Sequence, residues 1–431
     1  MGLTRTSEYG FPHARYYNMI QNILQESGAD TVSVIPQGGS SATVLRLKRG
    51  DQEFAAKFLI GEQNNRVDGH DLRSFRMKVK HQNWLRAGTD QIKTLYPEII
   101  QESNGEDWSW ITMLWWDGDS IIEGVYTGKV TLDLFCRRLQ RVLDFLFIHG
   151  YAHTITVSYP EYSTNAYISR VKRRLQYLLR TELKPIVLAD ELVVNGVKCF
   201  NPIVLLDRIE ASENLRRAIN PPKLYFPLHG DLNLRNLLIK NQFDEAEDND
   251  LGHYIHLLDP RGEITQWDIS YDIGKMFFSV SLFEALQDSS FTIDYSCESK
   301  FPKVTVQASS NWLTHFEAVL TAFCTALNRA STFRTMLERE EPLWQHRLLF
   351  VHACHTLAEA ACRVSAHTRD PGVEEIGIFR TGLNHAAILY ALGALMLDQW
   401  YQGMISHSLQ GPEDLLKSFP NWFGKAPHTH G

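Results

Sequence analysis

The chain has 431 residues, of which 44% are hydrophobic and 22% are charged, so it has the composition of a globular protein large enough for more than one core. Its formal net charge of −7 argues against a broad surface for polyanionic nucleic acid. The longest apolar run, residues 386–397, is shorter than the roughly 20 residues of a membrane-spanning helix, and the first residues lack the apolar core of a signal peptide. We therefore expect neither nucleic acid nor a membrane as a partner.

The N-terminal part predicts one helix followed by a small β-rich lobe. Residues 10–28 have a helical pattern that Gly28 ends, so residues 1–30 form a helical extension. A basic helix is expected at 72–87. The predicted strands lie on either side of it, at 31–36, 42–50, 52–60, 97–103 and 109–116, with Gly50 in a hairpin turn. We expect this lobe to cover residues 31–118.

The rest of the chain predicts a larger, mostly helical lobe over residues 119–431. Residues 131–149 place apolar side chains at helical spacing, with Thr131 as the N-cap. Residues 161–181 form a second candidate helix, and nearly everything beyond residue 310 has a helical pattern. The fold class is therefore α+β with two lobes. The six cysteines form no regular framework, which predicts reduced thiols in a cytoplasmic compartment.

Polar residues interrupt two apolar runs of the larger lobe. The stretch FPLHGDLNLRNLLIKN places His229, Asp231 and Asn236 among leucines, where a polar group without a partner costs about 1–3 kcal/mol. In the segment HLLDPRGE, Asp259 follows an apolar run and begins a predicted turn. An aspartate that can accept a proton, followed by asparagine and aspartate oxygens, suits Mg²⁺-dependent phosphoryl transfer, because magnesium prefers hard oxygen ligands and takes few of them from the protein.

These segments, together with WDISYDIGKMFFS, resemble the aminoglycoside phosphotransferase/choline kinase family, small-molecule kinases with the protein-kinase-like two-lobed fold. The resemblance implies that Asp231 is the catalytic base for an acceptor hydroxyl and that Asn236 and Asp259 hold Mg²⁺. It also implies that His229 braces the catalytic loop and that Asp272 hydrogen-bonds to the backbone of that loop. The alternative is a strand–turn–strand with polar turn residues, which leaves the polar groups in their apolar setting unexplained.

The N-terminal lobe supplies candidates for binding the phosphates of ATP or GTP. In PQGGSSATVLRL, the backbone of Gly38 and Gly39 can approach phosphates and Ser40 and Ser41 add donors, although any glycine-rich hairpin has the same pattern. Lys57 stands between apolar neighbours in FAAKFL and matches the family's lysine for the α- and β-phosphates. The alternative for Lys57 is an edge strand with its charged head in water.

The segment after the last strand of this lobe corresponds to the family's hinge, where backbone groups contact adenine. The resemblance assigns Met113, Leu114 and Trp115 to the adenine pocket. Plain inter-lobe core is the alternative for these residues.

One feature departs from the family pattern. Kinase-like folds pair the strand lysine with a glutamate from the next helix, but residues 63–97 contain no glutamate. The helix expected there carries Arg76, Lys78 and Lys80 instead. Either Asp71 replaces the glutamate or Lys57 is organised differently.

This departure keeps a second class of function open, a pseudokinase or nucleotide-binding regulatory module without phosphoryl transfer. A protein kinase is disfavoured because no APE-like activation segment follows Asp259. Nucleotidyl transfer on the same fold is a further alternative.

Two groups of polar residues in the helical lobe are candidates for contact with a small hydroxyl-bearing substrate. His352, His355 and Glu359 share one helical face, interpreted as turned toward the cleft; a structural role, or a zinc site with one more ligand, are the alternatives. The basic run comprises Arg170, Lys172, Arg173 and Arg174 and is either a solvated face or a contact for an anionic substrate. Since acidic clusters are few, a sugar, nucleoside or other polyol fits better than a cationic aminoglycoside.

Overall fold

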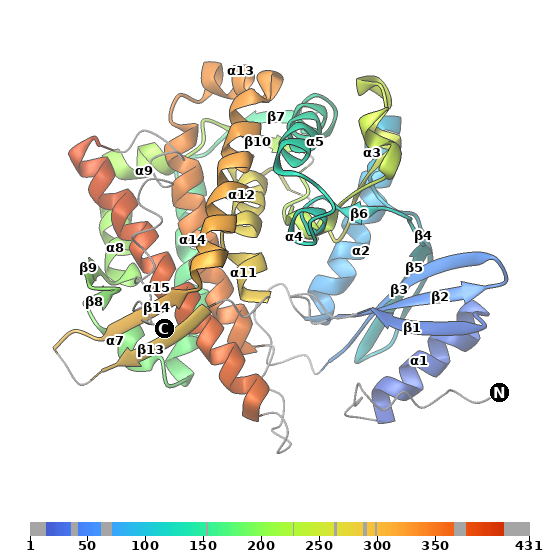
Figure 1. The fold of residues 1–431 in the computed structure, drawn as a ribbon, viewed down its shortest axis with the longest axis horizontal. Helices are drawn as coiled ribbons and strands as arrows, with labels where there is room; N and C mark the ends of the chain where they lie inside the picture. The colour runs from blue at the N-terminus through green and yellow to red at the C-terminus, as the bar shows by residue number, and fades with distance from the viewer. Residues whose placement is uncertain are drawn as a thin grey trace.

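The computed structural model describes residues 14–35, 42–61, 71–151, 154–226, 228–262, 265–287, 291–297, 300–365 and 376–408. These residues form two lobes, a small one built on a β-sheet and a large one built mostly of helices (Figure 1). The predicted α+β fold class is therefore confirmed. No helix of the described residues is both long and apolar enough to cross a membrane.

The small lobe is a five-stranded antiparallel sheet in the order β1-β2-β3-β5-β4. Its elements are α1 (Ala14–Ser27), β1 (Thr31–Ile35), β2 (Thr43–Arg49), β3 (Gln52–Ile60), α2 (Leu72–Arg86), α3 (Asp90–Leu95), β4 (Ile99–Asn104) and β5 (Trp108–Leu114). The strands fall where the sequence predicts them, whereas the short helix α3 was not expected. Gly50 has a φ of +59° at the predicted β2–β3 turn. Because Lys57 lies opposite both Val44 of β2 and Ile111 of β5, its strand is central and the edge-strand alternative is wrong.

The two faces of this sheet are covered by different helices. Alternate residues of β3, Phe54, Ala56 and Phe58, are buried against α1 with Ile23 of that helix. On the opposite face, Leu59 packs with Leu72, Phe75 and Val79 of α2. The same alternation puts Lys57 on the α2 face, which looks toward the large lobe.

The large lobe contains the remaining helices. They are α4 (Glu123–Tyr126), α5 (Leu132–Phe145), α6 (Ser169–Leu175), α7 (Lys184–Leu188), α8 (Pro202–Ala211), α9 (Glu213–Ile219), α10 (Ser270–Phe278), α11 (Glu284–Gln287), α12 (Ser310–Arg329), α13 (Ser331–Glu340), α14 (Trp344–Ser365) and α15 (Ile376–Ser406). Thr131 caps α5 as predicted, because its Oγ1 accepts a hydrogen bond from Leu134 N at 3.2 Å. The long helices α14 and α15 lie side by side (Figure 1), and both contribute to one continuous apolar core.

Short strands punctuate this lobe: β6 (Asp119–Ser120), β7 (Thr154–Val157), β8 (Glu191–Val194), β9 (Val197–Phe200), β10 (Lys223–Phe226), β11 (Leu237–Ile239), β12 (Ile255–Leu257), β13 (Phe291–Ser296) and β14 (Lys303–Ala308). The sheet β13-β14-β8-β9 was not predicted. Its β8–β9 turn is Asn195-Gly196, both with positive φ, a hairpin signal that the sequence does contain. The single helix expected at 161–181 is broken into a π-turn at Thr164–Ile168, α6, and a 3₁₀ turn at Leu178–Arg180.

Candidate active site

A β-hairpin of the large lobe places Asn236 beside Asp259. Asn236 directly precedes β11, and Asp259 follows β12, which pairs antiparallel with β11. Leu258 N donates a hydrogen bond to Asn236 O at 2.8 Å, which locks the two ends of the hairpin together. Residues separated by more than twenty positions in the chain are thus neighbours at one edge of the cleft.

His229 and Asp272 hold the loop that carries Asp231. His229 Nε2 donates to Leu258 O at 2.8 Å, and its Nδ1 accepts from Asp231 N at 3.2 Å. Burial lowers the pKa of His229 to about 4, so the imidazole is neutral and can make both bonds at once. Asp272, fully buried on α10, accepts from His229 N at 3.1 Å and from the Tyr151 hydroxyl at 3.2 Å. Burial raises the pKa of Asp272 to about 7.

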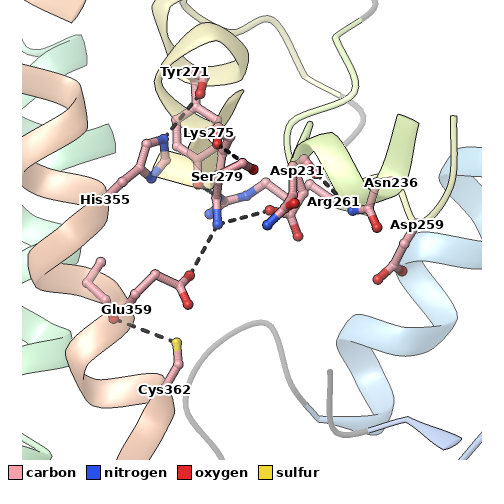
Figure 2. A network of polar contacts seen from close by, with 12 residues as sticks. Asp231, Asn236, Asp259, Arg261, Tyr271, Lys275, Ser279, His355, Glu359 and Cys362 are labelled. Atoms are coloured by element: carbon pink, nitrogen blue, oxygen red, sulfur yellow. Dashed lines mark hydrogen bonds and ion pairs between the residues drawn. The ribbon is translucent and has the colours of Figure 1, made fainter. Parts of the chain in front are cut away.

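Lys275 links Asp231 to Glu359. Its Nζ lies 3.0 Å from Asp231 Oδ1 and 3.1 Å from Glu359 Oε1, which comes from α14 (Figure 2). Burial opposes ionisation of Asp231, but the ammonium groups of Lys275 and Lys78 outweigh it and hold the pKa of Asp231 well below its usual range. Asn236 Nδ2 donates to Asp231 O at 3.1 Å and fixes the other side of the loop. Asp231 is therefore an ionised, positioned carboxylate.

Asp259 is held between two lysines from the small lobe. Its Oδ1 lies 2.9 Å from Lys57 Nζ and its Oδ2 lies 3.1 Å from Lys78 Nζ. These ammonium groups overcome the effect of burial and hold the pKa of Asp259 well below its usual range, whereas burial lowers the pKa of Lys57. Asp259 has a φ of +62°, a conformation that non-glycine residues seldom adopt and that clusters at functional sites.

The position of Lys78 depends on a close approach of the two lobes. Gly262 has a φ of +87°, and a Cβ added there would lie 2.6 Å from the backbone N of Lys78. Only glycine lets the turn after Asp259 lie this close to α2.

The α2 residue that contacts the Lys57–Asp259 pair is Lys78, not Asp71. Asp71 is the N-cap of α2, and its side chain accepts a hydrogen bond from Ser74 N at 2.6 Å. Arg76 is also structural, because its Nε donates to Ser109 Oγ at 2.8 Å and ties α2 to β5. Lys57 is thus organised by Asp259 across the cleft.

A cavity of about 520 Å³ lies between the lobes and is lined by four of the predicted polar site residues, whereas His229 and Asp272 are not part of its lining. Its polar lining includes Lys57, Asp231, Asn236 and Asp259. Its apolar lining comes from both lobes and includes Val44, Ala55, Ile111, Met113, Leu114, Trp115, Leu238 and Leu258. Met113, Leu114 and Trp115 thus line the cavity, and their assignment to an adenine pocket stays a prediction. The predicted phosphate loop with Gly38, Gly39, Ser40 and Ser41 lies outside the described residues.

The interpretation of the polar face on α14 is wrong for its histidines and right for its glutamate. His352 is buried, with Nε2 2.7 Å from Ser281 Oγ and its ring stacked on Phe277. His355 is buried with Nε2 3.1 Å from Tyr271 O. Both histidines join α14 to the α10 region because that face packs against another helix. Of the three residues, only Glu359 lines the cavity between the lobes, and the described residues contain no group of three or more His, Cys, Asp or Glu side chains placed to hold a metal ion.

Sequence reasoning did not assign Lys275 or Lys78 to the site. Lys275 lies three residues after Asp272 on α10, so the two side chains come from one helical turn, and this spacing was the available signal. For Lys78 the sequence showed only that a basic residue stands in the helix where an acid was expected. Its partner is 181 residues away in the chain, a pairing that no local pattern reveals.

The described residues form a two-lobed α+β fold with the candidate site in the cavity between the lobes. No protein-family model matches the chain, and no curated protein matches it. Among solved structures, the chain is similar to a putative fructosamine-3-kinase from Haemophilus somnus 129PT, with 12% identity and a TM-score of 0.43 over 89% of this chain and 96% of that one.

Two further solved structures are also similar to the chain. A microcompartment-associated aminopropanol kinase shares 14% identity with a TM-score of 0.41, over 91% of this chain and 99% of that one. An aminoglycoside-3′-phosphotransferase of type VIII shares 14% identity with a TM-score of 0.38, over 76% and 99%. These neighbours are small-molecule kinases. At such identities and TM-scores they carry no weight in the functional argument, which rests on the residues of the cleft.

Proposed function

We propose that the protein transfers the γ-phosphate of ATP or GTP to a hydroxyl of a small molecule in a Mg²⁺-dependent reaction. The observation that carries the proposal is the convergence of Lys57, Asp231, Asn236 and Asp259 on one cavity between the lobes. They come from distant segments, and each supplies one part of a phosphoryl-transfer site: a cation for phosphates, a base, and two oxygen donors for a metal.

The oxygen donors fit a magnesium ion. Because Asn236 uses its Nδ2 as a donor to Asp231 O, its carbonyl oxygen is available to a cation, and Asp259 adds an ionised carboxylate beside it. Hard oxygen ligands in small number are what Mg²⁺ takes from proteins in kinase sites. When bound, the ion would neutralise charge on the nucleotide phosphates.

Asp231 is the proposed base. In the transfer, the acceptor oxygen forms a bond to the γ-phosphorus, and the bond from that phosphorus to the bridging oxygen breaks, so that ADP or GDP leaves with the electron pair. The hydroxyl proton goes to the Asp231 carboxylate. With its pKa held low by Lys275, Asp231 acts chiefly by orienting the hydroxyl, and Lys57 and Lys78 offer positive charge to the phosphates.

The adenine or guanine ring is proposed to lie against the apolar lining of the cavity. Val44 and Ala55 from the small lobe and Leu238 and Leu258 from the large lobe offer apolar contacts to it. The backbone of the 113–116 segment would supply the hydrogen bonds, although Trp115 N already donates to Glu53 O at 2.9 Å.

All six cysteines are free thiols, five of them buried, which supports a reducing, cytoplasmic location.

A nucleotide-binding regulatory module is the second candidate. The observation that favours it is that both carboxylate oxygens of Asp259 are already paired with lysines. A metal must displace or share these contacts, and a cleft that keeps them would bind nucleotide without transferring phosphate.

The test measures nucleotide consumption with ATP and with GTP against a panel of hydroxyl-bearing metabolites and antibiotics, with the mass of each product determined. A gain of one phosphate supports the proposal and names the acceptor. A gain of a nucleotide would assign nucleotidyl transfer instead. Binding of Mg-nucleotide without any product would favour the regulatory module.

A further inference from the structure

A second cavity, of about 330 Å³, adjoins the nucleotide cavity at Asp231. The two cavities share the lining residues Lys78, Asp231, Lys275 and Glu359. An acceptor hydroxyl must reach Asp231 from the side away from the nucleotide base, so this second cavity is where an acceptor fits. Its volume is that of a site for a small metabolite.

The walls of this second cavity are basic. Its basic residues are Arg73, Lys78, Arg170, Arg174, Arg261 and Lys275, and its acidic residues are Asp71, Asp231 and Glu359. The three acidic side chains already have partners, because Asp71 caps α2 and Asp231 and Glu359 both contact Lys275. The electrostatic excess in this cavity is therefore positive.

Arg170 is a deeply buried cation in the wall of this second cavity. Only 7% of it is exposed, and its Cζ lies 5.5 Å from the centre of the Tyr271 ring. Its Nε has no hydrogen-bond partner, and no carboxylate among the described residues forms an ion pair with it. Burial and the like charge of Arg174 lower the pKa of Arg170 to about 10. A buried guanidinium without an anion costs stability, and a ligand that supplies the anion would recover it.

The other cations of the basic run show that α6 buries only one of its faces. Lys172 points away to Asp207 and Glu210, with 2.6 Å to an oxygen of each, and Arg173 is exposed. Arg170 and Arg174, four residues apart on α6, share the buried face that lines the cavity. The helix therefore presents two guanidinium groups to the cavity and keeps its other cations outside.

We propose that the acceptor carries an oxyanion, a carboxylate or a phosphate, which Arg170 binds in the second cavity while the acceptor hydroxyl reaches Asp231. This inference rests on the proposed kinase function and narrows its substrate class to hydroxy acids and phosphorylated polyols. A guanidinium matches both groups because its planar fork donates two parallel hydrogen bonds to a carboxylate or phosphate. Arg174 and Arg261 add positive charge on the same cavity wall.

The first experiment measures anion binding without catalysis. The nucleotide cavity is filled with Mg²⁺ and a non-hydrolysable ATP analogue, and inorganic phosphate or malonate is titrated by calorimetry. We expect the wild type to bind at least one of the two, and Arg170→Met to weaken that binding by roughly tenfold or more. Arg170→Lys should weaken it less. The control Arg173→Met removes the same charge from the exposed face of α6 and should leave binding unchanged.

Thermal unfolding tests whether Arg170→Met has a folding defect that could explain a loss of anion binding. In anion-free buffer Arg170→Met should unfold at the wild-type temperature or above it, because the guanidinium has no anion to lose. The proposal is overturned if the wild type binds neither anion, or if Arg170→Met lowers the unfolding temperature and leaves anion binding intact.

The second experiment compares turnover of acceptors matched in size that carry a phosphate, a carboxylate, an amide or an amine beside the hydroxyl. Turnover confined to the phosphate or to the carboxylate series, with KM raised in Arg170→Met, supports the proposal and tells the two anions apart. Turnover of the amide or amine series with an unchanged KM in that variant overturns it and leaves the kinase function standing. Anion binding without turnover of any acceptor would instead contradict the kinase function, and with it the role of the anion in an acceptor.

Discussion

Lys78 Nζ lies 3.1 Å from Asp259 Oδ2, so helix α2 offers a cation to the carboxylate that also binds Lys57. One carboxylate of the large lobe therefore binds a helix lysine and a strand lysine of the small lobe. Asp259 thus links the two lobes across the cleft.

Removal of Lys78 should favour a metal at Asp259. In Lys78→Met one carboxylate oxygen loses its ammonium partner and a repelling charge disappears, so we expect Mg²⁺ alone to bind about fivefold more tightly, equivalent to about 1 kcal/mol. Calorimetry without nucleotide measures this. The control Lys80→Met removes an exposed charge two residues later on α2 and should have no effect. Equal or weaker Mg²⁺ binding by Lys78→Met would show that Lys78 does not compete with the metal.

Removal of Lys275 should move the acid limb of the pH–rate profile. Lys275 is the main group that lowers the pKa of Asp231, so in Lys275→Met that pKa should rise, because burial is then opposed by fewer positive charges. Because the base must be unprotonated, activity should then be lost at a higher pH than in the wild type as the pH falls. The profile of kcat/KM against pH measures the shift. Lys172→Met, which removes a lysine paired with Asp207 outside the cleft, serves as the control. Superimposable profiles for Lys275→Met and wild type would contradict the account.

His229 should make folding stability depend on pH between about 6.5 and 4. Its pKa is 6.5 in an ordinary environment and about 4 in the buried site, so over this range the unfolded chain binds a proton that the folded chain does not. Stability should therefore fall as the pH falls, by up to about 3 kcal/mol from this residue. His229→Gln lacks this contribution, so the stability advantage of the wild type over it should shrink on acidification. Parallel stability curves for the two proteins would show that His229 titrates normally.

Arg347 should be essential for folding of the large lobe. Its Nε lies 2.9 Å from Asp268 Oδ2, and it also pairs with Glu341, with all three groups buried. Arg347→Met leaves two buried acids without a counterion and should cost about 3–5 kcal/mol of unfolding free energy in urea denaturation. Arg217→Met breaks an exposed pair with Glu213 and should change stability little. A small effect in Arg347→Met would contradict this account of the large lobe.

The sequence predicted those parts of the fold and the site that local pattern controls. The strands of the small lobe alternate apolar and polar side chains, and His229, Asp231, Asn236 and Asp259 stand out because they are polar residues in apolar runs. Their convergence could be inferred because one chemistry needs all of them. The β8–β9 hairpin was missed although its Asn-Gly turn was visible.

The remainder depends on contacts between distant segments. The sequence showed that α2 has a basic face but not that Lys78 reaches Asp259, because that distance depends on the close approach at Gly262. It also showed four cations in one run without showing that α6 buries Arg170 and Arg174 and exposes Arg173. Burial of His352 and His355 followed from helix packing that their spacing alone could not reveal.

The most direct test of the central claim, that Asp231 is the base of a phosphotransferase whose nucleotide site depends on Asp259, is a paired measurement of Mg-nucleotide affinity and turnover. Asp231→Asn should bind Mg-ATP like the wild type and lose about 10²- to 10⁴-fold in kcat, because it removes a group that acts on the acceptor. Asp259→Ala should lose magnesium-dependent nucleotide binding. Wild-type turnover of a confirmed acceptor by Asp231→Asn would contradict the claim.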